Sequence, residues 1–207
     1  MTDRITRNLG GTMTGNEHFI ANGHDIDISL RDFWQWAYSD FSNNISRSVL
    51  AEYIVATSLN YSGMSTETNR VMWQPFDLFA KDSANDKSYR VEVKSAAYVQ
   101  SWDAKHPDHI SFRIAPARMP DETGDYKADA PLQRNSDLYV FAIYKALSKD
   151  ESPFNLDLWE FYVLPTRVLD EKKPTQKTIT LPSLLQLEPT WCDYYGIGDA
   201  IKNTMNA

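Results

Sequence analysis

The chain contains almost no cysteine and no long hydrophobic segment. Its 207 residues include one cysteine, Cys192, which excludes an internal disulfide framework and a cysteine-based zinc site. The longest apolar stretch, residues 138–144, is far too short to cross a bilayer. The first 16 residues are polar and lack the apolar segment of a signal peptide. We therefore expect a protein of the reducing cytoplasm with no membrane partner.

Positive charge is also scarce. The chain carries 21 Lys and Arg against 28 Asp and Glu, a net charge of −7, which argues against a broad surface that coats nucleic acid. Chemistry on nucleic acid stays open, because a metal site gathers carboxylates and positive charge can be confined to one cleft. Four basic residues near a predicted loop are candidates for phosphate contacts, although interleaved acids cancel much of their charge: Arg113, Arg118, Lys127 and Arg134.

Two common binding motifs are missing. The segment Gly196-Ile-Gly198 lacks the preceding strand and the third glycine of a dinucleotide-binding loop. The histidines have no metal-ligand spacing with one another or with the cysteine; they are His18, His24, His106 and His109. Neither motif contributes to the functional prediction.

The length and a hydrophobic content of 42% fit one soluble globular domain, or one domain with a small appendage. Residues 1–27 show no sustained hydrophobic period and are predicted to be a flexible leader, followed by one domain over 28–207. Hydrophobic spacing predicts helices over residues 29–41 and 45–59, with Gly63 supplying the chain reversal. The proline-rich and charged segment 115–134 is predicted to be a long mobile loop.

Several segments have strand-like patterns, and a polar, turn-rich connection joins the first two into a hairpin. The stretch at 137–144 alternates little, which predicts a central strand buried on both faces. Helices followed by strands indicate an α/β or α+β protein, with a central mixed β-sheet flanked by helices. The predicted strands are residues 72–80, 89–97, 110–114, 137–144 and 158–164.

Charged residues interrupt the first two of these strands. Asp77 lies in an apolar stretch, and the second strand contains Val91-Glu92-Val93-Lys94. Residues two apart on a strand share a face, so Glu92 and Lys94 project together and the valines project the opposite way. Two carboxylates on neighbouring strands can converge on Mg²⁺. A cross-strand ion pair on a solvated face would give the same spacing.

This pattern resembles the PD-(D/E)xK nuclease superfamily, which has the restriction-endonuclease-like fold. In that family the aspartate lies on the second core strand and the Glu-x-Lys on the third, after a helix that often carries another acid. Here Pro75 lies two residues before Asp77 rather than next to it, a departure in the least fixed part of the motif. The resemblance covers residues 45–100 closely and the later strands in outline.

Two further residues extend the resemblance. Glu52 lies in a helix that is otherwise apolar almost all round, and buried acids need a partner or a metal. The family often uses a glutamate here, but pairing with Arg47 or Arg70 is the alternative. Gln100 follows Lys94 by six residues, where some branches carry a glutamine that completes the site; a polar residue at a strand end is again the alternative.

The resemblance implies a Mg²⁺-dependent endonuclease that cuts DNA in restriction, phage defence or repair, with Mn²⁺ as a substitute metal. Asp77, Glu92 and the backbone carbonyl of Val93 would hold the metal, Lys94 would activate water, and Glu52 and Gln100 would complete the site. Sequence recognition would come from loops of the domain or from a homodimer on a symmetric site. The alternative is a catalytically silent nuclease-fold module that binds nucleic acid or protein.

Overall fold

The computed structural model describes residues 12–70, 74–100, 109–119 and 129–206. The chain forms two compact units, Met1–Phe41 and Ser42–Ala207, which we describe separately. Within the described ranges, no helix is both long enough and apolar enough to span a membrane.

The first unit contains a β-hairpin, where the sequence analysis predicted a leader, and a helix within the range where a helix was predicted. Strands β1 (His18–Ala21) and β2 (His24–Ser29) pair antiparallel. Asn22 and Gly23 between them have φ of 52° and 80°, the left-handed pair that a tight two-residue hairpin loop requires. The boundary between the units therefore falls after Phe41 and not after residue 27.

Helix α1 (Leu30–Tyr38) completes this unit. Ser29 accepts a hydrogen bond from the Asp32 backbone N–H, and the Asp32 side chain accepts one from the Ser29 backbone N–H, so the helix begins with a capping box. No residue of α1 is buried. Large apolar side chains are exposed throughout residues 12–41: Met13, Phe19, Ile20, Ile26, Ile28, Phe33, Trp34, Trp36 and Tyr38.

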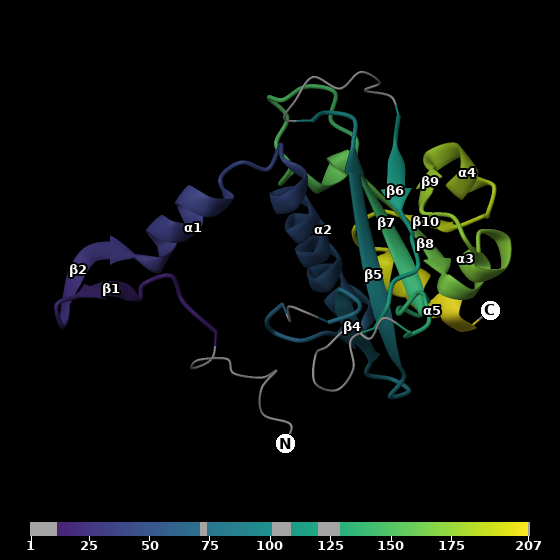
Figure 1. Ribbon diagram of the computed structural model, residues 1–207, viewed down its shortest axis with the longest axis horizontal. Coiled ribbons are helices and arrows are strands. Elements are labelled where there is room, and N and C mark those ends of the chain that lie inside the picture. The colour runs from purple at the N-terminus through teal and green to yellow at the C-terminus, as the bar shows by residue number, and fades with distance from the viewer. Residues whose placement is uncertain (1–11, 71–73, 101–108, 120–128, 207) are drawn as a thin grey trace. The chain divides into compact units, whose positions relative to one another are not determined.

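The second unit is built on a six-stranded mixed sheet (Figure 1). Neighbouring strands pair antiparallel except β5 and β7, which are parallel. This confirms the predicted fold class of a mixed sheet with helices packed on it. In spatial order the strands are β10 (Thr190–Cys192), β8 (Trp159–Pro165), β7 (Leu138–Tyr144), β5 (Ser88–Ala97), β4 (Leu78–Asp82) and β3 (Met64–Ser65).

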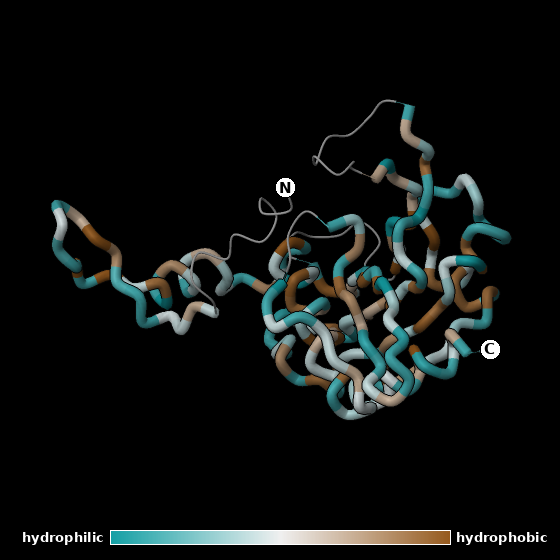
Figure 2. Tube along the Cα trace, turned by 90° about the horizontal axis from the view of Figure 1, so that it is seen from below, coloured by the Kyte–Doolittle hydropathy of each residue, from teal (hydrophilic) through white to brown (hydrophobic). Residues whose placement is uncertain are grey.

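Two hydrophobic clusters cover the two faces of this sheet, and hydrophilic residues lie mostly in the peripheral loops (Figure 2). Helices α2 (Asn44–Ser58) and α5 (Ile197–Asn206) pack into the first cluster. The second cluster contains residues of α3 (Thr166–Lys172), α4 (Leu181–Leu185) and the small sheet of β6 (Ser111–Arg113) and β9 (Thr178–Thr180). Strand β7 contributes to both clusters and is buried throughout, as the sequence predicts. Short 3₁₀ helices lie at Leu59–Ser62 and Leu156–Leu158.

Helix α2 begins and ends where the sequence places it. The Asn43 side chain accepts hydrogen bonds from the backbone N–H groups of Ile45 and Ser46, which satisfies donors that the first turn leaves open. After the helix and the following 3₁₀ turn, Gly63 adopts a φ of 65°, the left-handed conformation that glycine reaches without strain. The chain then turns back into β3 and β4.

The predicted mobile loop includes residues 120–128, which lie outside the described ranges, as does Lys127. On either side of that gap, Ala117 and Gln133 form an antiparallel bridge. Arg134 does not face solvent, because its side chain is 1% exposed. Its guanidinium donates to the Ile114 and Lys173 carbonyls at 2.9 and 2.8 Å and to Asp170 at 2.6 Å. Its predicted contact with a phosphate backbone is therefore wrong, and Arg134 joins β6 to α3.

We expect Arg134→Met to destabilise the second unit by about 1–3 kcal/mol, because the Ile114 and Lys173 carbonyls lose their donor. Urea unfolding followed by circular dichroism measures this. Arg113→Met, on the exposed side of β6, is the matched control and should change stability little. Equal stabilities of the two variants would contradict the structural role of Arg134.

Candidate functional site

Strand β5 separates its side chains as the sequence predicts. Val91 and Val93 are buried in the cluster that contains α2. Glu92 and Lys94 lie on the other face, next to Tyr139 and Phe141 of β7 in the parallel register. The side chains of Glu92 and Lys94 are 19% and 28% exposed and form an ion pair. The pair is thus half-buried at a sheet face rather than solvated on a surface.

Asp77 lies at the point where β4 begins. Its backbone N–H donates to the Val91 carbonyl at 3.0 Å, and its carboxylate accepts the Val93 N–H at 2.8 Å. The strand predicted from residue 72 starts only at Leu78; residues 71–73 lie outside the described ranges. Pro75 carries no N–H for a sheet hydrogen bond, and the Asp77 carboxylate takes the position that another strand residue would occupy.

This hydrogen bond also orients the Val93 carbonyl. In a strand, the N–H and the C=O of one residue point to the same side. Since the Val93 N–H points to Asp77, the Val93 carbonyl faces the same edge of β5. The Asp77 carboxylate and the Val93 carbonyl therefore lie on the same edge of β5.

Negative charge accumulates around Glu92. Burial raises the pKa of the Glu92 carboxyl, and the charge of Asp77 raises it further, while Lys94 opposes the shift. Burial and the nearby Glu92 carboxylate raise the pKa of Tyr139 to about 12. One lysine therefore does not offset the combined cost of burial and the neighbouring acid, and an additional cation would relieve it.

Glu52 lies on α2, and its residue is 6% exposed. Arg70 holds both carboxylate oxygens, with Nε–Oε2 and Nη2–Oε1 distances of 2.5 and 3.0 Å. Burial and the charge of Asp77 raise the pKa of Glu52, and Arg70 opposes this. The alternative of an arginine partner therefore holds, and direct binding of a metal by Glu52 would require Arg70 to leave.

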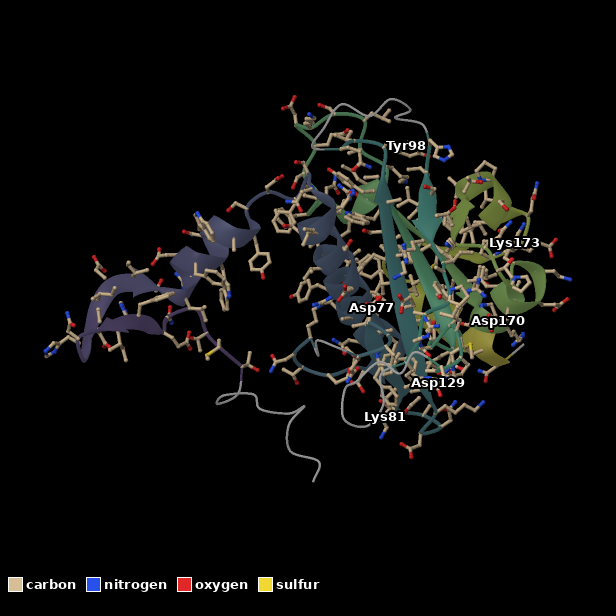
Figure 3. All side chains as sticks on the ribbon, viewed as in Figure 1. Asp77, Lys81, Tyr98, Asp129, Asp170 and Lys173 are labelled. Atoms are coloured by element: carbon tan, nitrogen blue, oxygen red, sulfur yellow. The ribbon has the colours of Figure 1, made fainter. Side chains whose placement is uncertain are left out.

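Gln100 does not join the carboxylates. Its amide nitrogen donates to the Ala97 carbonyl at 2.8 Å, and its amide oxygen accepts from Arg47 at 3.1 Å. Tyr98, just past the end of β5, lies well away from Asp77 (Figure 3). Gln100 thus connects the end of β5 to the start of α2. Arg47, the other predicted partner of Glu52, contributes to this connection.

The donor set fits a hard divalent cation bound by few protein ligands. The described part of the chain holds no group of three or more His, Cys, Asp or Glu arranged around a common ion. Mg²⁺ commonly keeps several waters and needs only one or two carboxylates from the protein. Asp77, Glu92 and the Val93 carbonyl are the oxygen groups of this region that could supply such ligands.

A cavity of about 320 Å³ lies next to Asp77, between α2 and the segment after β3. Sequence reasoning missed it, because α2 reads as apolar almost all round. Tyr53 and Thr57, which line the cavity, are four residues apart and share one face of α2, and Asn60 follows in the 3₁₀ helix. This polar stripe was the available signal.

Comparisons with known proteins identify no family. No family model matches the chain, and no curated protein is similar to it in sequence. Among solved structures, the chain is similar to a bacterial homing endonuclease, I-Ssp6803I, at 16% identity and a TM-score of 0.39, over 65% of this chain and 74% of that one. A likeness at this level assigns neither a family nor an activity.

The raised pKa of Glu92 has a consequence for stability. A carboxyl whose pKa is raised by folding stabilises the fold fully below its unfolded pKa, and this contribution is lost as the pH rises through the folded pKa. We therefore expect Glu92→Gln to raise the Tm above that of the wild type at pH 7 in EDTA. The difference should shrink below pH 4.5, the ordinary pKa of glutamate. Thermal melts across this range measure it, and a lower Tm for Glu92→Gln at pH 7 would contradict it.

Proposed function

We propose that the protein is a Mg²⁺-dependent deoxyribonuclease of the PD-(D/E)xK type. The observation that carries the proposal is the hydrogen bond from the Val93 N–H to the Asp77 carboxylate, which joins the aspartate to the Glu-x-Lys strand. The order of elements supports it, since α2 precedes the antiparallel strands β3, β4 and β5, and β7 runs parallel to β5. Asp77 immediately precedes the second of these strands, and Glu92 lies on the third.

In this proposal each residue has a distinct role. Asp77, Glu92 and the Val93 carbonyl hold Mg²⁺ or Mn²⁺. Bound metal supplies Lewis-acid stabilisation of the charge that develops on the phosphate. Lys94 orients the attacking water and assists its deprotonation, and its ion pair with Glu92 keeps the ammonium beside the metal-binding carboxylates.

Glu52 and Gln100 take supporting roles that differ from those expected. Glu52 holds Arg70, and both residues line the cavity next to Asp77. Glu52 thereby fixes the position of the Arg70 guanidinium and neutralises its charge. Gln100 stabilises the junction of α2 and β5 through Arg47 and so acts on the site only through the position of the strand.

A catalytically silent binding module is the second candidate. It is favoured by the pairing of two of the acids in the structure, Glu52 with Arg70 and Glu92 with Lys94. Such pairs neutralise charge without a metal. Asp77 and the raised pKa of Glu92 favour the enzyme, because a silent module has no physical need for this excess of negative charge.

Lys94→Ala separates the two candidates. We expect it to lower cleavage of DNA by about 10²–10⁴-fold, the range for loss of a group that assists proton transfer. Metal binding, read as a Mg²⁺- or Mn²⁺-dependent rise in Tm, should remain. Cleavage is measured on single-stranded, duplex and branched DNA with either metal.

Two further variants complete this test. Asp77→Asn should lose both cleavage and the metal-dependent rise in Tm. Lys81→Ala is the control, because Lys81 is an exposed lysine on β4 that pairs with Asp86. The nuclease proposal would be contradicted if the wild-type protein cuts no form of DNA and shows no change in Tm with either metal.

A further inference from the structure

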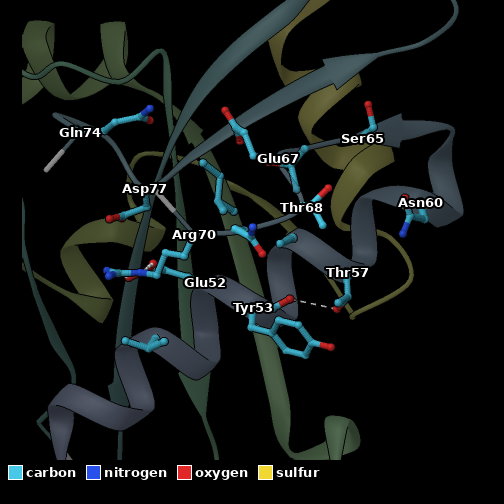
Figure 4. Close-up of a pocket in the computed structure, with 15 residues that line it drawn as sticks. Glu52, Tyr53, Thr57, Asn60, Ser65, Glu67, Thr68, Arg70, Gln74 and Asp77 are labelled. Atoms are coloured by element: carbon cyan, nitrogen blue, oxygen red, sulfur yellow. Dashed lines mark hydrogen bonds and ion pairs between the residues drawn. The ribbon is translucent and has the colours of Figure 1, made fainter. Parts of the chain in front are cut away.

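The cavity beside Asp77 has two chemically distinct ends (Figure 4). Glu52, Arg70 and Asp77 lie at one end, and Thr57, Asn60 and Ser65 lie at the other. The cavity therefore runs from the candidate metal ligands to a region of uncharged polar groups. Its volume of about 320 Å³ is at the lower limit for small-molecule sites, which suits one compact group.

The charges around the cavity exclude a phosphate as its occupant. Three acids line it, Glu52, Glu67 and Asp77. Arg70 is the one cation among the described lining residues, and its guanidinium is held by Glu52. Anions bind where N–H donors and unneutralised positive charge converge. An uncharged group is accordingly the better fit for the interior.

The remaining lining selects for a planar polar group. Val49, Ala56 and Leu78 provide apolar surface. Tyr53 adds an aromatic ring and is 66% exposed, so its ring is available to a ligand. Further hydroxyl and amide groups lie around this surface: Asn60, Ser65, Thr68 and Gln74. Apolar faces with polar edges describe a nucleobase.

We propose that this cavity receives one unpaired nucleobase of the DNA strand whose phosphate lies at Asp77. This inference rests on the proposed nuclease function and adds the class of substrate. A paired base must leave its stack before it can enter such a cavity, which costs energy that an unpaired base does not spend. The protein therefore acts on single-stranded DNA, or on DNA with an unpaired nucleotide at the cut, in preference to continuous duplex.

Cleavage of matched oligonucleotides tests the substrate class. The wild type is expected to cut a single strand at least about 10-fold faster than the same strand in a duplex, since extruding a paired base costs a few kcal/mol. An abasic position is then moved through the cut region. At one position its presence should slow cleavage by about 5–150-fold, the loss that corresponds to removing one stacked base.

Two variants connect that effect to the cavity. Tyr53→Ala removes an exposed ring, and Ala56→Leu fills the interior. Both should slow cleavage of the base-containing strand but not of the strand with the abasic position. Trp191→Ala is the matched control, because Trp191 is 60% exposed on β10, at the opposite edge of the sheet from β3. Melting curves establish folding, and Tyr53→Ala alone carries the test if Ala56→Leu does not fold.

Binding without cleavage separates failure of the inference from failure of the proposed function. Fluorescence anisotropy in EDTA measures the affinity for a labelled single-stranded oligonucleotide with and without the abasic position. If no DNA is cut but Tyr53→Ala weakens binding only of the base-containing strand, the nuclease proposal fails and the base-binding cavity stands. If DNA is cut and neither cavity variant nor the abasic position changes cleavage or binding, the inference is overturned and the nuclease proposal stands.

Discussion

The hydrogen bond between the Asp77 carboxylate and the Val93 N–H is the contact on which the candidate site depends. Strand β4 pairs with β5 only from Leu78 onward, so the edge of β5 beyond that point needs another partner. A buried N–H without an acceptor is costly, and Asp77 supplies the acceptor. One bond thereby satisfies the sheet edge and fixes an acid beside Glu92. The hydrogen bond that completes this sheet edge on folding therefore also places Asp77 in the candidate site.

The electrostatics of the site follow from that placement. Asp77 raises the pKa of both Glu52 and Glu92, so each additional acid makes the others harder to ionise. Arg70 and Lys94 each hold one of these acids, and neither overcomes the cost of burial. Charged groups retained at a cost to stability are expected where a site must bind a cation. We infer that, if the proposed cation binds here, the protein without it is less stable and its affinity for the cation is correspondingly higher.

Hydrophobic patterns within single strands correctly predicted which side chains share a face and which strand is buried. The alternation along β5 placed Glu92 and Lys94 on one face, and the apolar run of β7 predicted burial on both faces. Contacts between distant segments escaped prediction. Arg134 is buried because α3 and the end of β6 surround it, and Gln100 meets Arg47 from another element. The β1–β2 hairpin was a different failure, since its Asn22-Gly23 loop is a local signal that the polar composition around it obscured.

Helix α2 connects these features, because its faces serve different purposes. Ala51 and Val55 are buried in the core, which fixes how the helix lies on the sheet. Its other faces then place Glu52 near Asp77, and Tyr53 and Thr57 along the cavity. Since core packing leaves a helix little freedom to shift, the distance between the candidate metal site and the cavity is set by the hydrophobic core. In the proposed complex, the nucleobase in the cavity and the phosphate at the metal site would therefore lie at a fixed separation. A fixed separation gives the site a means to select for an unpaired base.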